Sequence, residues 1–135
     1  MINVIMGLKG SGKTKKLIDS INATAASAQG SVVCIEYGSN LRYEVKSSVR
    51  LVSSKEYGIN NLDMLKGFLS GLHAGNYDIT NVYIDNLYKT IGNDRAIGES
   101  FILWCAEFAK ANDMNITLTV SDDPEQASED VKAYL

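Results

Sequence analysis

Four residues near the start of the chain have the types and the spacing needed to hold phosphate. Gly7 is followed, after four intervening residues, by Gly12, Lys13 and Thr14. Glycines let backbone amides turn inward around phosphate oxygens, a lysine reaches the β- and γ-phosphates, and a threonine hydroxyl binds Mg²⁺. We therefore expect ATP or GTP to bind, with Mg²⁺, to the whole stretch: Gly7, Leu8, Lys9, Gly10, Ser11, Gly12, Lys13 and Thr14.

The sequence on either side of this stretch supports the same interpretation. The apolar run from Ile2 to Met6 predicts a buried strand, and a helical pattern follows from Lys13 to about Gly30. Lysines at positions 9, 13, 15 and 16 crowd the expected start of that helix, where the helix dipole disfavours cations. A bound anion would offset this repulsion, although Lys15 and Lys16 are equally explained by side chains that point into solvent.

The composition limits the class of protein. With 135 residues, 45% of them apolar and 21% charged, the chain is expected to form one domain over residues 1–135. A net charge of −3 argues against a general nucleic-acid or anionic-membrane surface, though not against one small basic patch, so nucleic acid is not an expected partner. Cys34 and Cys105 lie in apolar segments and are expected to be reduced core thiols. Because His73 is the only histidine, we expect no zinc site.

No targeting or membrane-spanning segment is expected. Met1 leads directly into the first apolar run, without a charged leader or a cleavage site. No apolar stretch in the chain approaches the ~20 residues that a bilayer span requires. We therefore expect a soluble, cytoplasmic protein.

Strand-length apolar runs alternate with helical patterns along the chain. This alternation predicts a three-layer α/β/α fold with a mainly parallel central sheet of about five strands. The expected strands are 2–6, 31–37, 49–52, 81–85 and 115–120, and the expected helices are 13–30, 62–75 and a long one from about residue 94. Residues 41–48 fit a loop or a short hairpin. Asp123 as N-cap, followed by Pro124 and Gln126, predicts a final helix.

Asp85 and Asn86 directly follow one of these strands. An aspartate at this position is expected to hold Mg²⁺ together with Thr14, because strand ends gather at one edge of a parallel sheet. The alternative is an aspartate that caps a turn. Many proteins that hydrolyse nucleotides have a glutamate after this aspartate, where it deprotonates the attacking water. Asn86 can hold a water but cannot take its proton, which predicts slow hydrolysis.

Other polar residues are candidates for the missing roles. Glu36, near the end of the second strand, is a possible substitute base, as are Asp122 and Asp123, although Glu36 also fits a plain carboxylate at the sheet edge. Ser121 follows the last strand, where it would either sense the γ-phosphate or form a turn. Three arginines could stabilise charge or simply be solvated: Arg42, Arg50 and Arg95.

The stretch Gly7–Thr14 fits the Walker A pattern, and with Asp85 at a Walker B-like position the chain resembles the P-loop NTPase superfamily. Within it, the resemblance is to the RecA-like branch, in which another strand separates the Walker A and Walker B strands. It extends to small bacterial proteins labelled PilT-like (twitching-motility) ATPases and to the thymidine kinase-like architecture. The latter has an Arg-Tyr segment after the second strand, here Arg42-Tyr43. The zinc cysteines of that family are missing and its glutamate is Asn86 here, so thymidine kinase activity is not implied.

Three classes of function fit these residues. The first is a slow or partner-dependent Mg²⁺-dependent nucleoside triphosphatase in which Lys13 neutralises charge and Asn86 or Glu36 handles the water. The second is a kinase with an acceptor pocket near Gly38, Arg42 and Tyr43. The third is a nucleotide-responsive binding module without turnover. Because the chain is short, we expect a homo-oligomer or a protein partner to complete the site.

Overall fold

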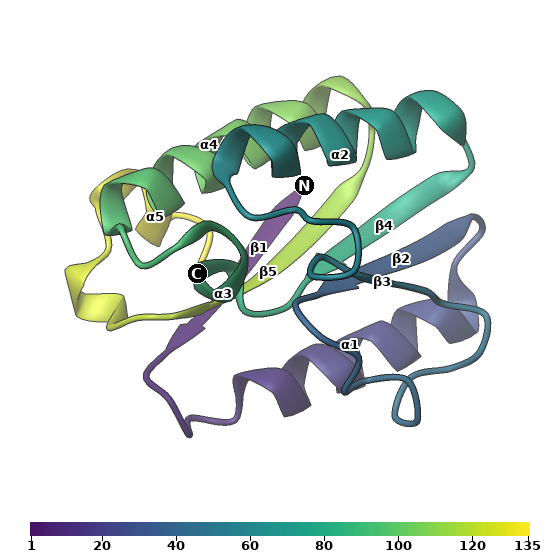
Figure 1. Ribbon diagram of the computed structural model, residues 1–135, viewed down its shortest axis with the longest axis horizontal. Helices are drawn as coiled ribbons and strands as arrows, with labels where there is room; N and C mark the ends of the chain where they lie inside the picture. Colours follow the sequence, from purple (N-terminus) through teal and green to yellow (C-terminus); the bar gives the residue numbers. More distant parts are fainter.

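The computed structural model describes residues 1–135, and its centre is a sheet of five parallel strands (Figure 1). The strands are β1 (Ile2–Gly7), β2 (Ser31–Glu36), β3 (Arg50–Ser53), β4 (Ile79–Ile84) and β5 (Asn115–Ser121). The helices are α1 (Lys13–Ser27), α2 (Leu62–Gly75), α3 (Leu87–Ile91), α4 (Arg95–Ala111) and α5 (Glu129–Lys132), with a 3-10 turn, η1, at Pro124–Gln126. The predicted three-layer α/β/α fold and its five strands are confirmed.

Helices cover both faces of the sheet, which explains why its inner strands read as continuous apolar runs. On one face, Leu17 and Ile21 of α1 pack against alternate strand residues such as Cys34 and Tyr83. On the other face, α2 and α4 lie side by side over a larger core that includes Phe101. In Figure 1, α1 lies below the sheet and α2 and α4 lie above it.

The strand order is β1-β5-β4-β2-β3, so β5 lies between the strand that leads into the glycine-rich stretch and the strand that leads into Asp85. The register pairs Gly7 with Ser121 and Ile84 with Leu118. Because all pairs are parallel, the segments after β1, β4 and β5 leave the sheet at one edge. This edge carries the glycine-rich stretch, Asp85, Asn86 and Ser121, and Glu36 ends β2 at the same edge.

Two elements differ from those expected. Helix α3 was not predicted, because five residues are too few to show a helical period. At the end of the chain, Asp123 caps only the 3-10 turn η1, by accepting a bond from the Glu125 amide. The predicted N-cap and the proline after it are therefore confirmed, but the helix that they begin is only this 3-10 turn. The chain becomes extended at Ala127, whose side chain is buried in the core, and a new N-cap at Ser128 starts α5.

The loop between β2 and β3 contains turns and no hairpin, which decides between the two alternatives for residues 41–48. The Asn22 side chain of α1 holds this loop by donating to the Glu44 carbonyl and accepting from the Lys46 amide, both at 2.9 Å. No helix of the chain has the length and apolar character of a membrane span.

Candidate functional site

The glycine-rich stretch forms a turn that needs its glycines. Gly10 and Gly12 both have a φ of +86°, a backbone conformation that side chains with a Cβ rarely adopt. Gly7 differs, since a Cβ there would displace the Ser11 hydroxyl and would lie tightly against the Ser11 Cβ. The turn delivers the chain into α1, whose first turn contains no acidic residue to complement the helix dipole.

This turn forms one wall of a pocket of about 380 Å³ that no hydrophobic side chain lines. From the turn and α1, Lys9, Gly10, Gly12, Lys13 and Thr14 line it. Gly7, Leu8 and Ser11 do not, although the Leu8 carbonyl accepts a bond from the Lys13 ammonium at 3.1 Å. A pocket without hydrophobic side chains and with three lysines at its border suits a polyanion.

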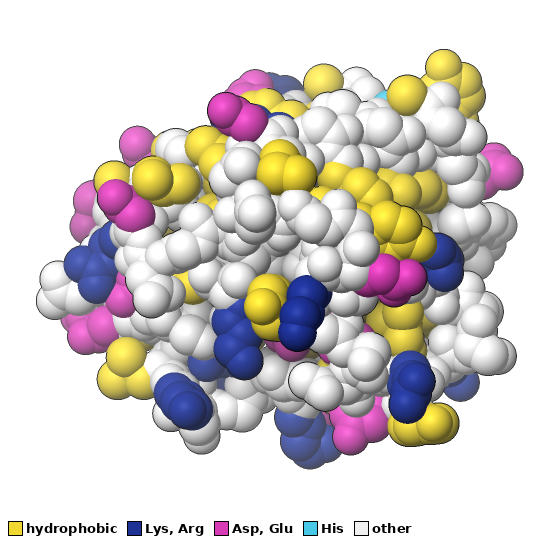
Figure 2. Space-filling view, in the orientation of Figure 1, with side chains coloured by type: hydrophobic (Ala, Val, Ile, Leu, Met, Phe, Trp, Pro, Cys, Tyr) yellow, Lys and Arg dark blue, Asp and Glu magenta, His cyan; other side chains and the backbone are white.

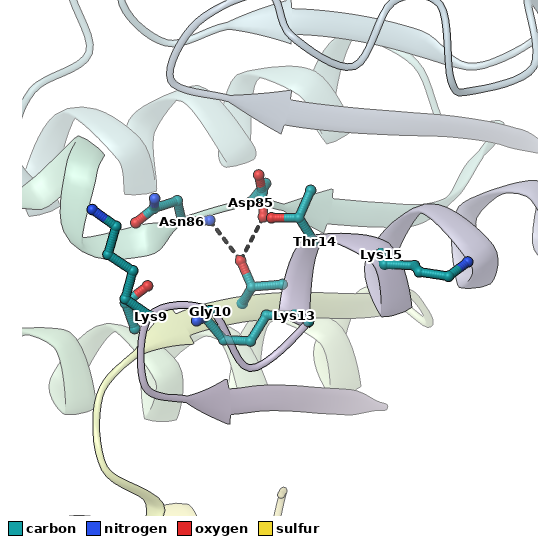
Figure 3. Close-up of a pocket in the computed structure, with 10 residues that line it drawn as sticks. Lys9, Gly10, Lys13, Thr14, Lys15, Asp85 and Asn86 are labelled. Atoms are coloured by element: carbon teal, nitrogen blue, oxygen red, sulfur yellow. Dashed lines mark hydrogen bonds between the residues drawn. The ribbon is translucent and has the colours of Figure 1, made fainter.

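The opposite wall consists of strand ends, with Asp85, Asn86, Thr119 and Ser121 (Figure 3). The predicted Mg²⁺ residues, Thr14 and Asp85, therefore lie in the same pocket as Lys13. Lys15 also borders the pocket, but Figure 3 shows its side chain extending along α1 away from Asp85. It forms an exposed ion pair with Asp19 at 3.4 Å, in line with the solvent alternative.

Thr119 links Asp85 to Asn86 and was missed by the sequence reasoning. Its hydroxyl donates to Asp85 Oδ1 at 2.7 Å and accepts from the Asn86 amide at 2.6 Å (dashed in Figure 3). The residue is almost completely buried in β5. The only sign of Thr119 in the sequence is a polar residue in an apolar strand. Threonine is common in strands of every kind, so this sign does not distinguish a site residue.

Asn86 has a φ of 58° and a ψ of 66°, which is the left-handed conformation. Asparagine is several-fold enriched in this conformation, whereas residues with longer side chains, such as glutamate, are not. Its side chain makes no hydrogen bond to cap α3 and instead lines the pocket. The backbone turn therefore gives a reason for asparagine at this position that is independent of catalysis.

The donor set fits a hard divalent cation. Mg²⁺ prefers oxygen ligands and keeps several waters, so it needs one or two protein oxygens and substrate phosphates. Thr14 offers a hydroxyl, and Asp85 offers Oδ2, which accepts no hydrogen bond because only Oδ1 is bonded to Thr119.

Glu36 lies beside this site, on the neighbouring strand. The register pairs Ile35 with Ile84, and the Asp85 amide donates to the Ile35 carbonyl at 2.9 Å, so Glu36 and Asp85 are cross-strand neighbours. The Glu36 side chain is almost fully buried. Its two oxygens accept the amides of Asn40 (2.8 Å) and Leu41 (3.2 Å). It thus shapes the turn after β2, and each oxygen retains a free lone pair.

A second hollow of about 210 Å³ opens between Glu36 and the main pocket. Thr14, Asp85 and Asn86 border both, so the two spaces adjoin. Arg42 and Tyr43 do not line either space. A hollow thus exists near Gly38, where an acceptor pocket was expected, but Arg42 and Tyr43 do not line it.

Asp122 is held in an ionic cluster outside the pocket. Arg95 donates to both of its oxygens, at 2.8 and 2.9 Å, and the Tyr88 hydroxyl donates at 2.7 Å. The bond from Arg95, together with those from Tyr88 and the Asp123 amide, holds the pKa of Asp122 well below its usual range. Burial and the bond to Asp122 raise the pKa of Tyr88. A carboxylate so engaged is a poor base, and Arg95 is not free to stabilise a phosphate.

The remaining candidates lie apart from the pocket. Asp123 caps η1, Arg42 lies against the Tyr43 ring, and Arg50 begins β3 at the opposite edge of the sheet. None of the three arginines lines the pocket.

No protein-family model matches this sequence, and no curated protein shows significant similarity to it.

Proposed function

We propose that the chain is a P-loop nucleoside triphosphatase that binds ATP or GTP with Mg²⁺ in the pocket between the glycine-rich turn and the ends of β4 and β5. The observation that carries the proposal is the meeting of Lys13, Thr14 and Asp85 in one polar pocket, although Asp85 is 71 residues further along the chain than Thr14. The position of β5 between β1 and β4 supports the RecA-like branch.

Each side chain has a task that its position allows. Backbone amides of the turn and the Lys13 ammonium hold the phosphates, for which Lys13 exchanges its bond to the Leu8 carbonyl for a phosphate oxygen. Thr14 and Asp85 hold Mg²⁺, which when bound neutralises charge on the β- and γ-phosphates. Thr119 fixes the orientation of the Asp85 carboxylate, and Ser121 offers a hydroxyl at the same wall.

Hydrolysis needs a base, and Glu36 is the carboxylate placed for it. Its neighbour Asp85 marks the Mg²⁺ position, and the hollow between them has room for several waters, at ~30 Å³ each. The water oxygen forms a bond to the γ-phosphorus, its proton passes to Glu36, and the bond to the β–γ bridging oxygen breaks to release the nucleoside diphosphate. Asn86 orients the water with its free amide. The bonds from Asn40 and Leu41 restrain Glu36, which supports a slow basal rate.

A partner or a second copy is proposed to accelerate this reaction. No arginine of the chain lines the pocket, and an added arginine at the transferring phosphate increases rates by ~10³–10⁵. Phosphotransfer is the second candidate, favoured by the hollow beside Glu36, which would hold an acceptor hydroxyl in place of water.

Single-turnover assays with γ-labelled ATP and GTP test these functions. Release of labelled phosphate in Mg²⁺ with water alone supports the triphosphatase, and a rate that increases with protein concentration supports self-association. Transfer of label to an added acceptor supports the kinase. Nucleotide-dependent stabilisation without turnover supports a binding module, and no stabilisation by either nucleotide contradicts the proposal.

A further inference from the structure

Charge is distributed unevenly over the molecule. Residues 1–57, which include the glycine-rich turn, α1 and the loops after β2 and β3, carry eight of the 13 Lys and Arg residues but four of the 16 Asp and Glu residues. Their formal charge is +4, and that of residues 58–135 is −7. Figure 2 shows most of the Lys and Arg side chains of this face in its lower half, on the α1 side of the sheet. A net negative chain thus has a basic region.

Three exposed tyrosines belong to the same part of the chain as these cations. Tyr37, Tyr43 and Tyr57 are 39%, 85% and 54% exposed, and all three belong to the loops that follow β2 and β3. The Arg42 guanidinium lies 4.9 Å from the centre of the Tyr43 ring, and the Lys55 ammonium lies 5.9 Å from that of Tyr37. We call these five residues the aromatic rim: Tyr37, Arg42, Tyr43, Lys55 and Tyr57.

The rim is held in place by the fold. The Tyr37 carbonyl accepts bonds from the Ser53 hydroxyl (3.0 Å) and the Lys55 amide (3.2 Å), which joins the two loops. Asn22 of α1 holds the part that carries Arg42 and Tyr43. Exposed rings on fixed backbone lose little entropy when a ligand stacks on them.

We propose that the aromatic rim binds single-stranded nucleic acid. Bases stack on the tyrosine faces that Arg42 and Lys55 leave open. The two cations contact phosphates, as does Lys89, which lines the adjoining hollow together with Tyr37. Flat aromatic faces next to cations fit unpaired bases. A duplex hides its base faces, and an acidic protein or an anionic membrane would need the charge alone.

The test is a titration of fluorescein-labelled oligo(dT) or oligo(U), of about 20 nucleotides, with the full chain in low salt and without nucleotide. We expect binding in the range of ~10⁻⁴–10⁻⁶ M, measured by anisotropy. Tyr43→Ala and Tyr57→Ala should each weaken binding about tenfold, since one stacked base is lost. Arg42→Gln should reduce the slope of log affinity against log salt by about 0.7, the value of one phosphate contact on a single strand.

The matched control is Tyr77→Ala. Tyr77 is 80% exposed but follows α2 and precedes β4, at the opposite edge of the sheet, so its removal should leave binding unchanged. Lys13→Ala should also leave it unchanged. Loss of binding in Lys13→Ala would show that the oligonucleotide occupies the phosphate turn, and this would overturn the inference without affecting the proposed nucleotide site.

Three other results would also overturn the inference. These are no binding up to about 100 μM protein, equal binding of a duplex of the same length, and equal weakening by Tyr77→Ala. Thermal unfolding of each variant shows whether it is folded under the assay conditions.

Discussion

The polar pocket beside the glycine-rich turn and the Asp122 cluster are joined by a single peptide bond, between Ser121 and Asp122, but their polar groups are used in opposite ways. In the cluster, Arg95, Tyr88 and the Asp123 amide occupy both Asp122 oxygens. In the pocket, Asp85 keeps Oδ2 free and the Asn86 side chain makes no bond. The hydrogen-bonded charges of the Asp122 cluster stabilise the fold. The unbonded polar atoms of Asp85 and Asn86, at the end of the sheet, are available to a ligand. The following predictions test this division.

Lys13→Ala should have the largest effect on the pocket. Because its ammonium is the group proposed to hold the β- and γ-phosphates, ATP and GTP should no longer raise the temperature of unfolding in Mg²⁺. Lys15→Ala is the control, because the Lys15 side chain is paired with Asp19. If Lys13→Ala still showed the full stabilisation, nucleotide would have to bind elsewhere.

Glu36→Gln should lower single-turnover hydrolysis by about 100-fold, the lower end of what a general base contributes. Nucleotide-dependent stabilisation should persist, because Glu36 lines the adjoining hollow and not the phosphate pocket. The comparison variant is Asn86→Glu, with Asn86→Gln as its control of equal length. A rate that Glu36→Gln leaves unchanged and Asn86→Glu raises would place the need for a base at position 86.

Thr119→Val should weaken Mg²⁺ binding about tenfold, since the Asp85 carboxylate loses its orienting hydroxyl. Isothermal titration of the nucleotide complex with Mg²⁺ measures this. Thr119→Ser keeps the hydroxyl and should restore most of the affinity. Equal losses in both variants would point to packing in β5 instead of the hydrogen bond.

Asp122→Asn should leave nucleotide binding unchanged and lower the free energy of unfolding by about 1–2 kcal/mol at neutral pH, because hydrogen bonds to a charged group are lost. The folded pKa of Asp122 lies below its unfolded value of about 3.9, so its contribution is present above pH ~4 and disappears as the pH falls further. Denaturant unfolding of both proteins from pH 7 to 3 should therefore show a difference that shrinks below pH ~4. A constant difference would mean that the charge of Asp122 does not matter.

The sheet and the pocket residues were predictable from the sequence for different reasons. Apolar runs with two buried faces identify parallel strands, and the glycine spacing with Lys13 and Thr14 identifies the turn. Asp85 could be assigned to the same edge because parallel strands end together.

Roles that depend on the register or on side-chain direction were not predictable. Thr119 resembles any strand threonine until β5 is placed between β1 and β4. Asp122 follows a strand just as Asp85 does, yet it turns toward Arg95, 27 residues before it in the chain. Nothing in the local sequence distinguishes a carboxylate that faces a pocket from one that faces a guanidinium.

The left-handed turn at Asn86 restricts which amino acids can be exchanged there. Glycine, asparagine and aspartate accept this conformation most easily, and other residues cost about 1–2 kcal/mol. Selection of variants for thermal stability should therefore return those three residues at position 86, whatever the reaction requires. At position 86, a longer carboxylate such as glutamate would therefore strain the backbone, whereas aspartate would not.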